Sequence, residues 1–203
     1  MDRIDPESLR ASVEGRRIIV GICGGIAAYK VAAVVSGLAQ AGAECTVAMS
    51  ESATRFVAPL TFQSLSGRPV YTDIWSHIEA SDPQHIATAR AAECMLIAPC
   101  TMDCLARLAT GRADDIVTLL AASIDRRRFP VLLAPSMNEV MWNQPATQRN
   151  LQTLRADGFG ILAPGEGWQA CRTVGVGRLP EPAELVAAVL EAIGPVRADG
   201  RRP

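Results

Sequence analysis

The stretch PVLLAPSMNEVMW, residues 130–142, decides the fold that we expect for this chain. Its first five residues form a short apolar run, which is typical of a buried β-strand. Pro135 has no N–H to donate, so we expect the strand to end before it. Residues 135–142 then form a polar turn at the carboxyl end of that strand. Open parallel sheets bind their ligands at this position.

Asn138 in this turn supports two interpretations. An asparagine side chain presents both a donor and an acceptor to a ligand. Asparagine is also a preferred N-cap residue, in which case the following methionine and tryptophan would pack in the core. The residue types alone leave both interpretations open.

Further apolar runs predict neighbouring strands at residues 17–22, 44–49, 94–98 and 160–163. Helical segments are expected after them, ending near Gln40, Thr110, Ser123, Asp157 and Ile193. Strands that alternate with helices predict an α/β fold, a Rossmann-like doubly wound parallel sheet. Right-handed crossovers bring the strand ends to one edge of such a sheet.

We expect a single flavodoxin-like domain over residues 17–193. A loose N-terminal arm, residues 1–16, precedes it, and a disordered tail, residues 194–203, follows it. Residues 165–182 contain four glycines and two prolines, which predicts a mobile C-terminal flap.

Bulk composition excludes several classes of protein. The chain has 203 residues and a formal charge of −1, which gives no electrostatic argument for nucleic acid or an anionic membrane. It has no secretion signal and no apolar run near the roughly 20 residues of a membrane helix. We therefore expect a cytoplasmic protein with reduced cysteines. The spacing of Cys100 and Cys104 lacks a second ligand pair, so no metal site is expected.

The turn Gly24-Gly25-Ile26-Ala27 follows the first strand and opens a helix. Small residues let backbone N–H groups approach a phosphate, and the helix dipole favours its charge. The spacing is not G-x-G-x-x-G, so a dinucleotide fingerprint is absent. A packing turn without a ligand is the alternative. Ser50 and Ser52, after the second strand, are either helix caps or contacts to the same ligand.

Taken together, these motifs resemble the homo-oligomeric flavin-containing cysteine decarboxylases. Pro135-x-Met137-Asn138-x-x-Met141-Trp142 matches one signature of that family at all its defined positions, and the resemblance covers about residues 17–182. It implies FMN as the cofactor and a trimer, possibly a dodecamer, with FMN lying between subunits. The cofactor-binding residues that it implies are Gly24, Gly25, Ile26, Ala27, Ser50, Ser52, Phe56, Pro99, Cys100, Thr101 and Met102.

The resemblance also implies a mechanism. FMN oxidises the thiol side of a cysteine, and the resulting thioaldehyde loses CO2 easily because the carbanion delocalises onto sulfur. His85 is the implied base, and Asn138 is the implied partner of the departing carboxylate. Cys171, in the flap, corresponds to a cysteine that helps to reduce the enethiol product. The implied substrate contacts are Met137, Asn138, Met141, Trp142 and Arg172.

Two departures bear on the substrate. Asp103 stands where the family has asparagine, and an ionised carboxylate beside a substrate carboxylate repels it. Arg172 stands where the family member that acts in coenzyme A synthesis has glycine. These departures favour oxidative decarboxylation of the C-terminal cysteine of a ribosomal peptide, giving an aminoenethiol. Cys171 favours the alternative, a phosphopantothenoylcysteine decarboxylase of coenzyme A synthesis. A non-catalytic regulatory flavoprotein is a lesser alternative.

Overall fold

The computed structural model describes residues 4–75 and 84–195. Six described strands form one parallel sheet in the order β3-β2-β1-β4-β5-β6. Its strands are β1 (Arg17–Ile22), β2 (Glu44–Met49), β3 (Val70–Tyr71), β4 (Cys94–Cys100), β5 (Val131–Pro135) and β6 (Gly160–Ile161). The order reverses between β1 and β4, as the doubly wound prediction requires, so that prediction is confirmed.

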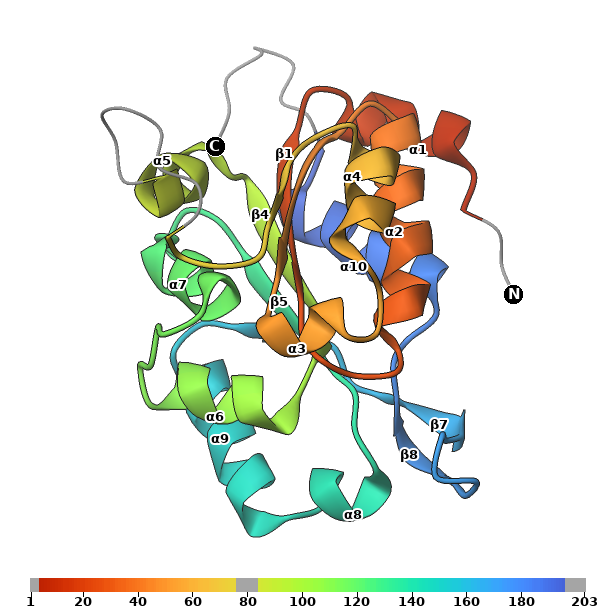
Figure 1. Ribbon diagram of the computed structural model, residues 1–203, viewed down its shortest axis with the longest axis vertical. Helices are drawn as coiled ribbons and strands as arrows, with labels where there is room; N and C mark the ends of the chain where they lie inside the picture. The colour runs from red at the N-terminus through yellow and green to blue at the C-terminus, as the bar shows by residue number, and fades with distance from the viewer. Residues whose placement is uncertain (1–3, 76–83, 196–203) are drawn as a thin grey trace.

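Helices cover both faces of the sheet (Figure 1). One face carries α1 (Pro6–Val13), α2 (Ala28–Gln40), α4 (Pro59–Ser66) and α10 (Pro182–Ile193). The other carries α5 (Gln84–Ala91), α6 (Met102–Ala109), α7 (Ile116–Ser123) and α9 (Pro145–Ala156). Two single-turn helices, α3 (Glu51–Thr54) and α8 (Glu139–Trp142), follow β2 and β5 directly.

The alternation of side chains along each strand builds two separate cores. The first core lies between the sheet and α1, α2, α4 and α10, and the second lies between the sheet and α5, α6, α7 and α9. In β1, Ile18 and Val20 pack against α2 and its neighbours, whereas Ile19 faces the opposite cluster. Successive residues of a strand point to opposite faces, so a strand covered on both sides is apolar throughout. β4 accordingly has every residue buried. This rigid double-sided core holds the strand ends, and the turns after them, at one edge.

The N-terminal segment differs from the loose arm that we expected. Residues 6–13 form a helix because Asp5 caps it and Pro6 occupies its first turn. Val13 is fully buried in the first core, and Ile4 packs against Gly37 of α2. A Cβ at Gly37 would lie 2.6 Å from Ile4, so the glycine allows the contact.

The two proline positions differ slightly from the prediction. β4 and β5 continue to Cys100 and Pro135 instead of ending before the prolines. A proline at the end of a strand still offers its carbonyl, and the Pro99 carbonyl accepts a hydrogen bond from Cys23. The peptide bond between Ala98 and Pro99 is cis.

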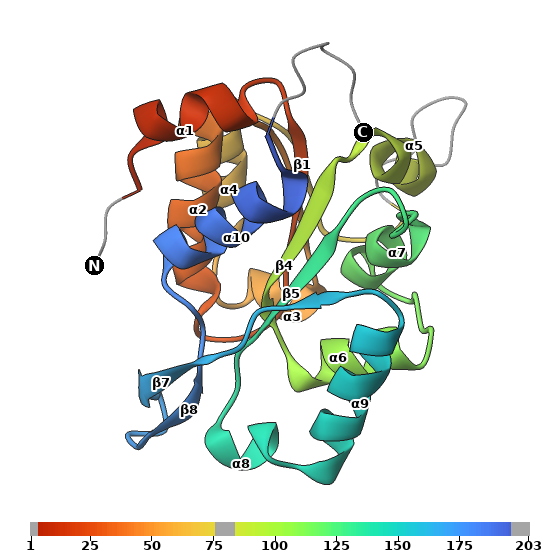
Figure 2. The same cartoon turned by 180° about the vertical axis from the view of Figure 1, so that it is seen from behind.

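Residues 165–182, where we expected a mobile loop, contain an antiparallel hairpin. Its strands are β7 (Gly165–Trp168) and β8 (Val174–Arg178), and Trp168 pairs with Val174. Both views show the hairpin and α8 at the end of the sheet where β1, β4 and β5 stop (Figures 1 and 2). We keep the name flap for residues 165–182.

Some expectations fall outside the description. Residues 1–3 of the arm and 196–203 of the tail lie outside the described residues. Among the residues described, no helix is long and apolar enough to cross a membrane.

Candidate functional site

A cavity of about 1000 Å³ opens at the carboxyl edge of the sheet. Its walls come from the turns after β1, β2, β4 and β5 and from the flap. The predicted site residues that line it are Gly24, Gly25, Ile26, Ala27, Ser50, Ser52, Thr101, Met102, Asp103, Met137, Asn138, Met141 and Cys171. Residues far apart in the chain therefore meet in one cavity, as the sheet topology requires.

The Gly24 turn is packed against the start of α3. A Cβ at Gly24 would lie 2.4 Å from the Ser52 Cβ and 2.9 Å from its carbonyl carbon, so only glycine fits. Ser50 caps α3 by accepting a hydrogen bond from the Ala53 N–H. The glycine turn therefore packs against α3, and this packing also brings Ser50 and Ser52 to the rim of the cavity.

The N-terminus of α2 suits an anion. Ala27 is its N-cap residue and supplies no side-chain cap, and its first turn carries no acidic residue. The N–H groups of Ala28 and Lys30 donate to the Gly25 and Ala27 carbonyls, and the helix dipole at this end favours negative charge. Ile26 and Tyr29 beside it are exposed and line the same cavity, so an apolar surface borders the anion site.

Three buried thiols lie beneath the cavity. Cys104 hydrogen-bonds to both Cys23 and Cys100. The hydrogen bond with Cys104, together with burial, raises the pKa of Cys23 well above the ordinary thiol value, and the hydrogen bond with Cys100, together with burial, does the same for Cys104. These thiols stay protonated and are poor nucleophiles. Among the described residues, no group of histidine, cysteine or acidic side chains is arranged to hold a metal ion.

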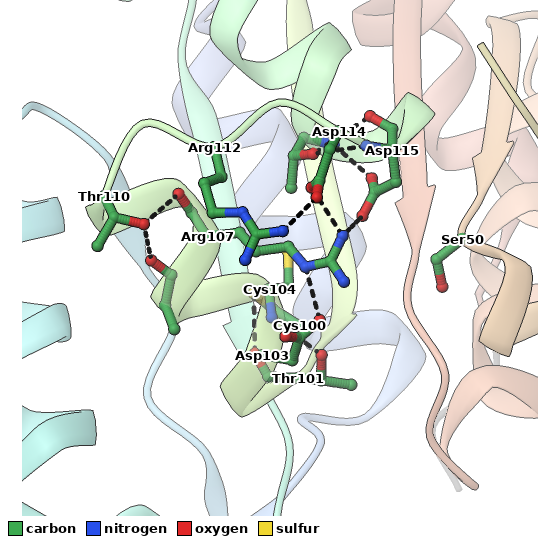
Figure 3. A network of polar contacts seen from close by, with 12 residues as sticks. Ser50, Cys100, Thr101, Asp103, Cys104, Arg107, Thr110, Arg112, Asp114 and Asp115 are labelled. Carbon is green, nitrogen blue, oxygen red and sulfur yellow. Dashed lines mark hydrogen bonds and ion pairs between the residues drawn. The ribbon is translucent and has the colours of Figure 1, made fainter.

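Asp103 and Arg107 form an ion pair at the cavity wall (Figure 3). Arg107 Nε lies 2.8 Å from Asp103 Oδ2, four residues earlier on α6. Its Nη1 also contacts Asp114 at 2.9 Å and Asp115 at 3.1 Å. Partial burial opposes the charged guanidinium, but the three carboxylates outweigh it and raise the pKa of Arg107. Asp103 therefore faces a fixed cation.

Asn138 caps a helix and also lines the cavity, so its contact with a ligand stays a prediction. Its Oδ1 accepts a hydrogen bond of 2.8 Å from the Val140 N–H and so caps α8. That bond turns Nδ2 towards the flap, where it donates to Cys171 Sγ at 3.1 Å and faces Gln169 Oε1 at 3.4 Å. The cap thus fixes the amide with its donor at the cavity.

Cys171 differs from the five other cysteines because it is exposed. Hydrogen bonds from Thr173 and from Asn138 lower the pKa of its thiol. The Asn138 amide and this exposed thiol thus meet at one point of the cavity. That pairing joins the turn after β5 to the flap.

Several predicted residues do not line the cavity. His85 lies at the start of α5 and does not line the cavity. Phe56, Trp142 and Arg172 do not line it either. Trp142 instead packs against the second core. Arg172 occupies the exposed turn of the flap with a φ of 65°, a left-handed conformation that glycine adopts without strain.

Pro99 and Cys100 also lie outside the lining. The Pro99 ring lies directly behind the glycine turn, 3.6 Å from where a Cβ of Gly25 would be. Cys100 is buried beneath Cys104. Both residues shape the floor of the cavity from below.

The lining residues that were not predicted as site residues include Lys30, Arg107, Gln169 and Arg178. Lys30 Nζ lies 2.9 Å from Glu181, which Arg178 also contacts. Of these residues, only Arg107 could have been found from the sequence, because it lies four residues after Asp103 on a helix and this spacing favours an ion pair. Nothing in the pattern around Gln169 marks it.

The chain belongs to the Flavoprotein family, whose model matches residues 6–194. The resemblance seen in the sequence motifs is thereby confirmed, and FMN is the cofactor. The cavity fits FMN: the glycine turn and the uncapped α2 end suit its phosphate, and the apolar wall suits its ring system.

Two curated relatives show which proteins the chain is similar to. The coenzyme A biosynthesis bifunctional protein CoaBC of Bacillus subtilis is 45% identical over 176 residues, which is 86% of this chain and 42% of the relative. The CoaBC of Vibrio cholerae is 41% identical over 191 residues, 94% of this chain and 47% of the relative. The chain thus spans less than half the length of these relatives.

Two solved structures share the fold along nearly their whole length. A cysteine-to-serine mutant of PPC decarboxylase, complexed with pantothenoylaminoethenethiol, has a TM-score of 0.79 at 28% identity and covers 87% of this chain and 97% of its own. The FMN-dependent cysteine decarboxylase SpaF has a TM-score of 0.75 at 29% identity, covering 91% and 99%.

Replacing Gly24 tests the role of the turn. We expect Gly24→Ala to weaken FMN binding at least about tenfold, because the new Cβ separates the turn from Ser52. FMN titration with fluorescence quenching measures the affinity. Gly25→Ala is the control for packing, because its Cβ meets only Pro99 at 3.6 Å and should leave the melting temperature of the apoprotein unchanged. Wild-type FMN affinity in Gly24→Ala would contradict this role.

Proposed function

We propose that the chain decarboxylates phosphopantothenoylcysteine in coenzyme A synthesis. The observation that carries the proposal is the contact of Cys171 Sγ with Asn138 Nδ2 at 3.1 Å. It brings a thiol with a lowered pKa to the amide that we expect to hold the substrate carboxylate. The curated relatives named above support the same substrate, because their names assign them to coenzyme A biosynthesis. This was the alternative reading of the sequence, and it is now preferred.

The substrate carboxylate would accept a hydrogen bond from Asn138 Nδ2. The amide cannot flip to present its oxygen, because Oδ1 is held by the Val140 N–H. Met137 and Met141 line the cavity beside it. A carboxylate surrounded by such apolar groups loses hydration, which disfavours its charged form and favours release of neutral CO2.

FMN, when bound, supplies the two-electron oxidation of the substrate cysteine and returns the same two electrons to the enethiol that decarboxylation leaves. Reduction of that enethiol to a saturated thiol also requires a proton on carbon. Cys171 is the group that we assign to this transfer: its thiol gives the proton and becomes a thiolate. Hydrogen bonds from Asn138 and Thr173 stabilise the thiolate. The overall change in the substrate is then the loss of CO2 alone.

His85 keeps its proposed role as the base, but only in an assembly. Its position on α5 lies outside the cavity lining of its own chain. A second copy of the chain would have to bring His85 to the site, which agrees with the homo-oligomer that the family resemblance implies. The trimer and the dodecamer stay proposals.

Peptidyl-cysteine decarboxylation is the second candidate. The structural similarity to SpaF favours it, since the TM-score is only slightly lower than that of PPC decarboxylase. Arg172 and Asp103 are the departures in this chain that support it. The two candidates share FMN, Asn138 and the loss of CO2, and they differ in whether the enethiol is afterwards reduced.

Product masses distinguish the candidates. We expect the FMN-loaded protein to convert phosphopantothenoylcysteine to a product that has lost CO2 alone, and Cys171→Ser to release a product that has lost CO2 and two hydrogens. A peptide ending in cysteine is the competing substrate. Turnover of the peptide alone would contradict the proposal, and FMN binding without turnover of either substrate would indicate a regulatory flavoprotein.

Asp103→Asn tests how the charge beside the substrate carboxylate acts. We expect the KM for phosphopantothenoylcysteine to fall about threefold or more, because a repulsive charge is removed while Arg107 keeps Asp114 and Asp115. Stability should change by less than about 1 kcal/mol, since the Asp103 side chain is 70% exposed. Steady-state kinetics and chemical unfolding measure the two effects.

Asp125→Asn is the matched control. Asp125 pairs with Arg127 on the surface and does not line the cavity, so the KM of the Asp125→Asn variant should equal that of the wild type. A raised KM in Asp103→Asn would mean that the carboxylate helps to bind the substrate, contrary to our account.

A further inference from the structure

The flap turn between β7 and β8 is internally hydrogen-bonded. The Gln169 N–H donates to the Thr173 carbonyl at 2.8 Å, and the Arg172 N–H donates to the Gln169 carbonyl at 2.9 Å. These bonds close a short loop with Cys171 in its middle. The position of Cys171 is thus set by the residues on either side of it.

Gln169 ties this turn to the body of the flap. It is 8% exposed, and its Nε2 donates to the Val176 carbonyl at 2.9 Å. That bond turns Oε1 towards Asn138 Nδ2 at 3.4 Å and Cys171 Sγ at 3.5 Å. A buried amide with both ends engaged is an acceptor of fixed direction, so it can take the hydrogen of the Cys171 thiol.

Thr173 is the nearest polar side chain to the sulfur in this group of contacts. Its Oγ1 lies 3.0 Å from Cys171 Sγ, and either atom can be the donor. A thiolate has no hydrogen to give, so the hydroxyl must then donate, as the Asn138 amide does from the other side at 3.1 Å. The thiol and the thiolate therefore each have partners without any movement of the turn.

We propose that Thr173 is a positioning residue that aims the Cys171 sulfur at the Asn138 amide and stabilises its thiolate. The proposal concerns the ionisation and direction of Cys171, and its consequence for the product rests on the proposed decarboxylation. No family signature in the sequence motifs includes Thr173, and its role follows from the hydrogen bonds of this flap.

Charged groups around Cys171 come from four elements. Arg172 is the next residue of the turn, and Glu139 on α8 lies against Gly175 of β8. Arg178 lies at the end of β8, and the Asp103–Arg107 pair lines the cavity on α6. Thr173 is uncharged, so replacing it changes the hydrogen bond to sulfur while this set of charges stays the same.

Alkylation of the native protein by iodoacetamide measures the Cys171 thiolate directly. The five other cysteines are buried, and burial raises the pKa of Cys45 and Cys94 to about 12, so they do not compete. We expect Thr173→Val to slow alkylation at pH 7 by about 3- to 10-fold and to move its pH profile upward, because a donor to the thiolate is lost. Mass spectrometry after peptide digestion identifies the modified residue.

Rescue separates a hydrogen-bonding role from a structural one. Thr173→Ser retains the hydroxyl and should return the alkylation profile to that of the wild type. Thr153→Val, which removes an exposed hydroxyl of α9 bonded to the Arg149 carbonyl, should leave it unchanged. An unchanged profile in Thr173→Val, or a profile in Thr173→Ser that matches Thr173→Val, would overturn the proposal.

The product provides a second readout. With phosphopantothenoylcysteine, Thr173→Val should raise the share of enethiol over saturated thiol, because proton transfer from Cys171 slows. If neither substrate is decarboxylated, the proposed function fails while the alkylation profile still decides the role of Thr173. An upward shift of that profile with wild-type product ratios would overturn the link between Thr173 and product reduction.

Discussion

The close approach of the flap to the turn after β5 is the constraint on which the site depends. The Met137 N–H donates to the Gly177 carbonyl at 3.0 Å. A Cβ at Gly177 would lie 2.0 Å from the Met137 carbonyl oxygen, and the glycine has a φ of 137°, which side chains rarely adopt. Only glycine allows β8 to lie this near, and the contact brings Cys171 to Asn138. Two residues 33 positions apart in the chain, Asn138 and Cys171, thereby meet at the cavity.

On two walls of the cavity, charged side chains lie against groups of opposite charge. Arg107 is surrounded by three carboxylates on one side, and Lys30 and Arg178 share Glu181 on the other. Asp103, which the sequence predicts to repel a substrate carboxylate, lies 2.8 Å from the Arg107 guanidinium. The ion pair therefore reduces the repulsion that the Asp103 carboxylate would exert on a nearby anion.

The sequence predicted the strands and turns well because they rest on local patterns. Apolar runs that end in small polar turns identified the core strands, and the turns of Gly24 and Asn138 line the cavity as expected. β3 has only two residues and gives no such pattern. The hairpin of the flap was missed because glycines that relieve a close contact, such as Gly177, resemble glycines of a mobile loop. The position of His85 outside the cavity was also beyond a single sequence, since its predicted role depends on a second copy of the chain.

In the proposed reaction the electrons taken from the substrate return to it, so that no external oxidant is needed. The most direct measurement is the amount of product formed per bound FMN when phosphopantothenoylcysteine is supplied without oxygen. We expect many turnovers for each FMN and a saturated thiol as the product. A reaction that stops after one product per FMN, with an enethiol released, would contradict this expectation.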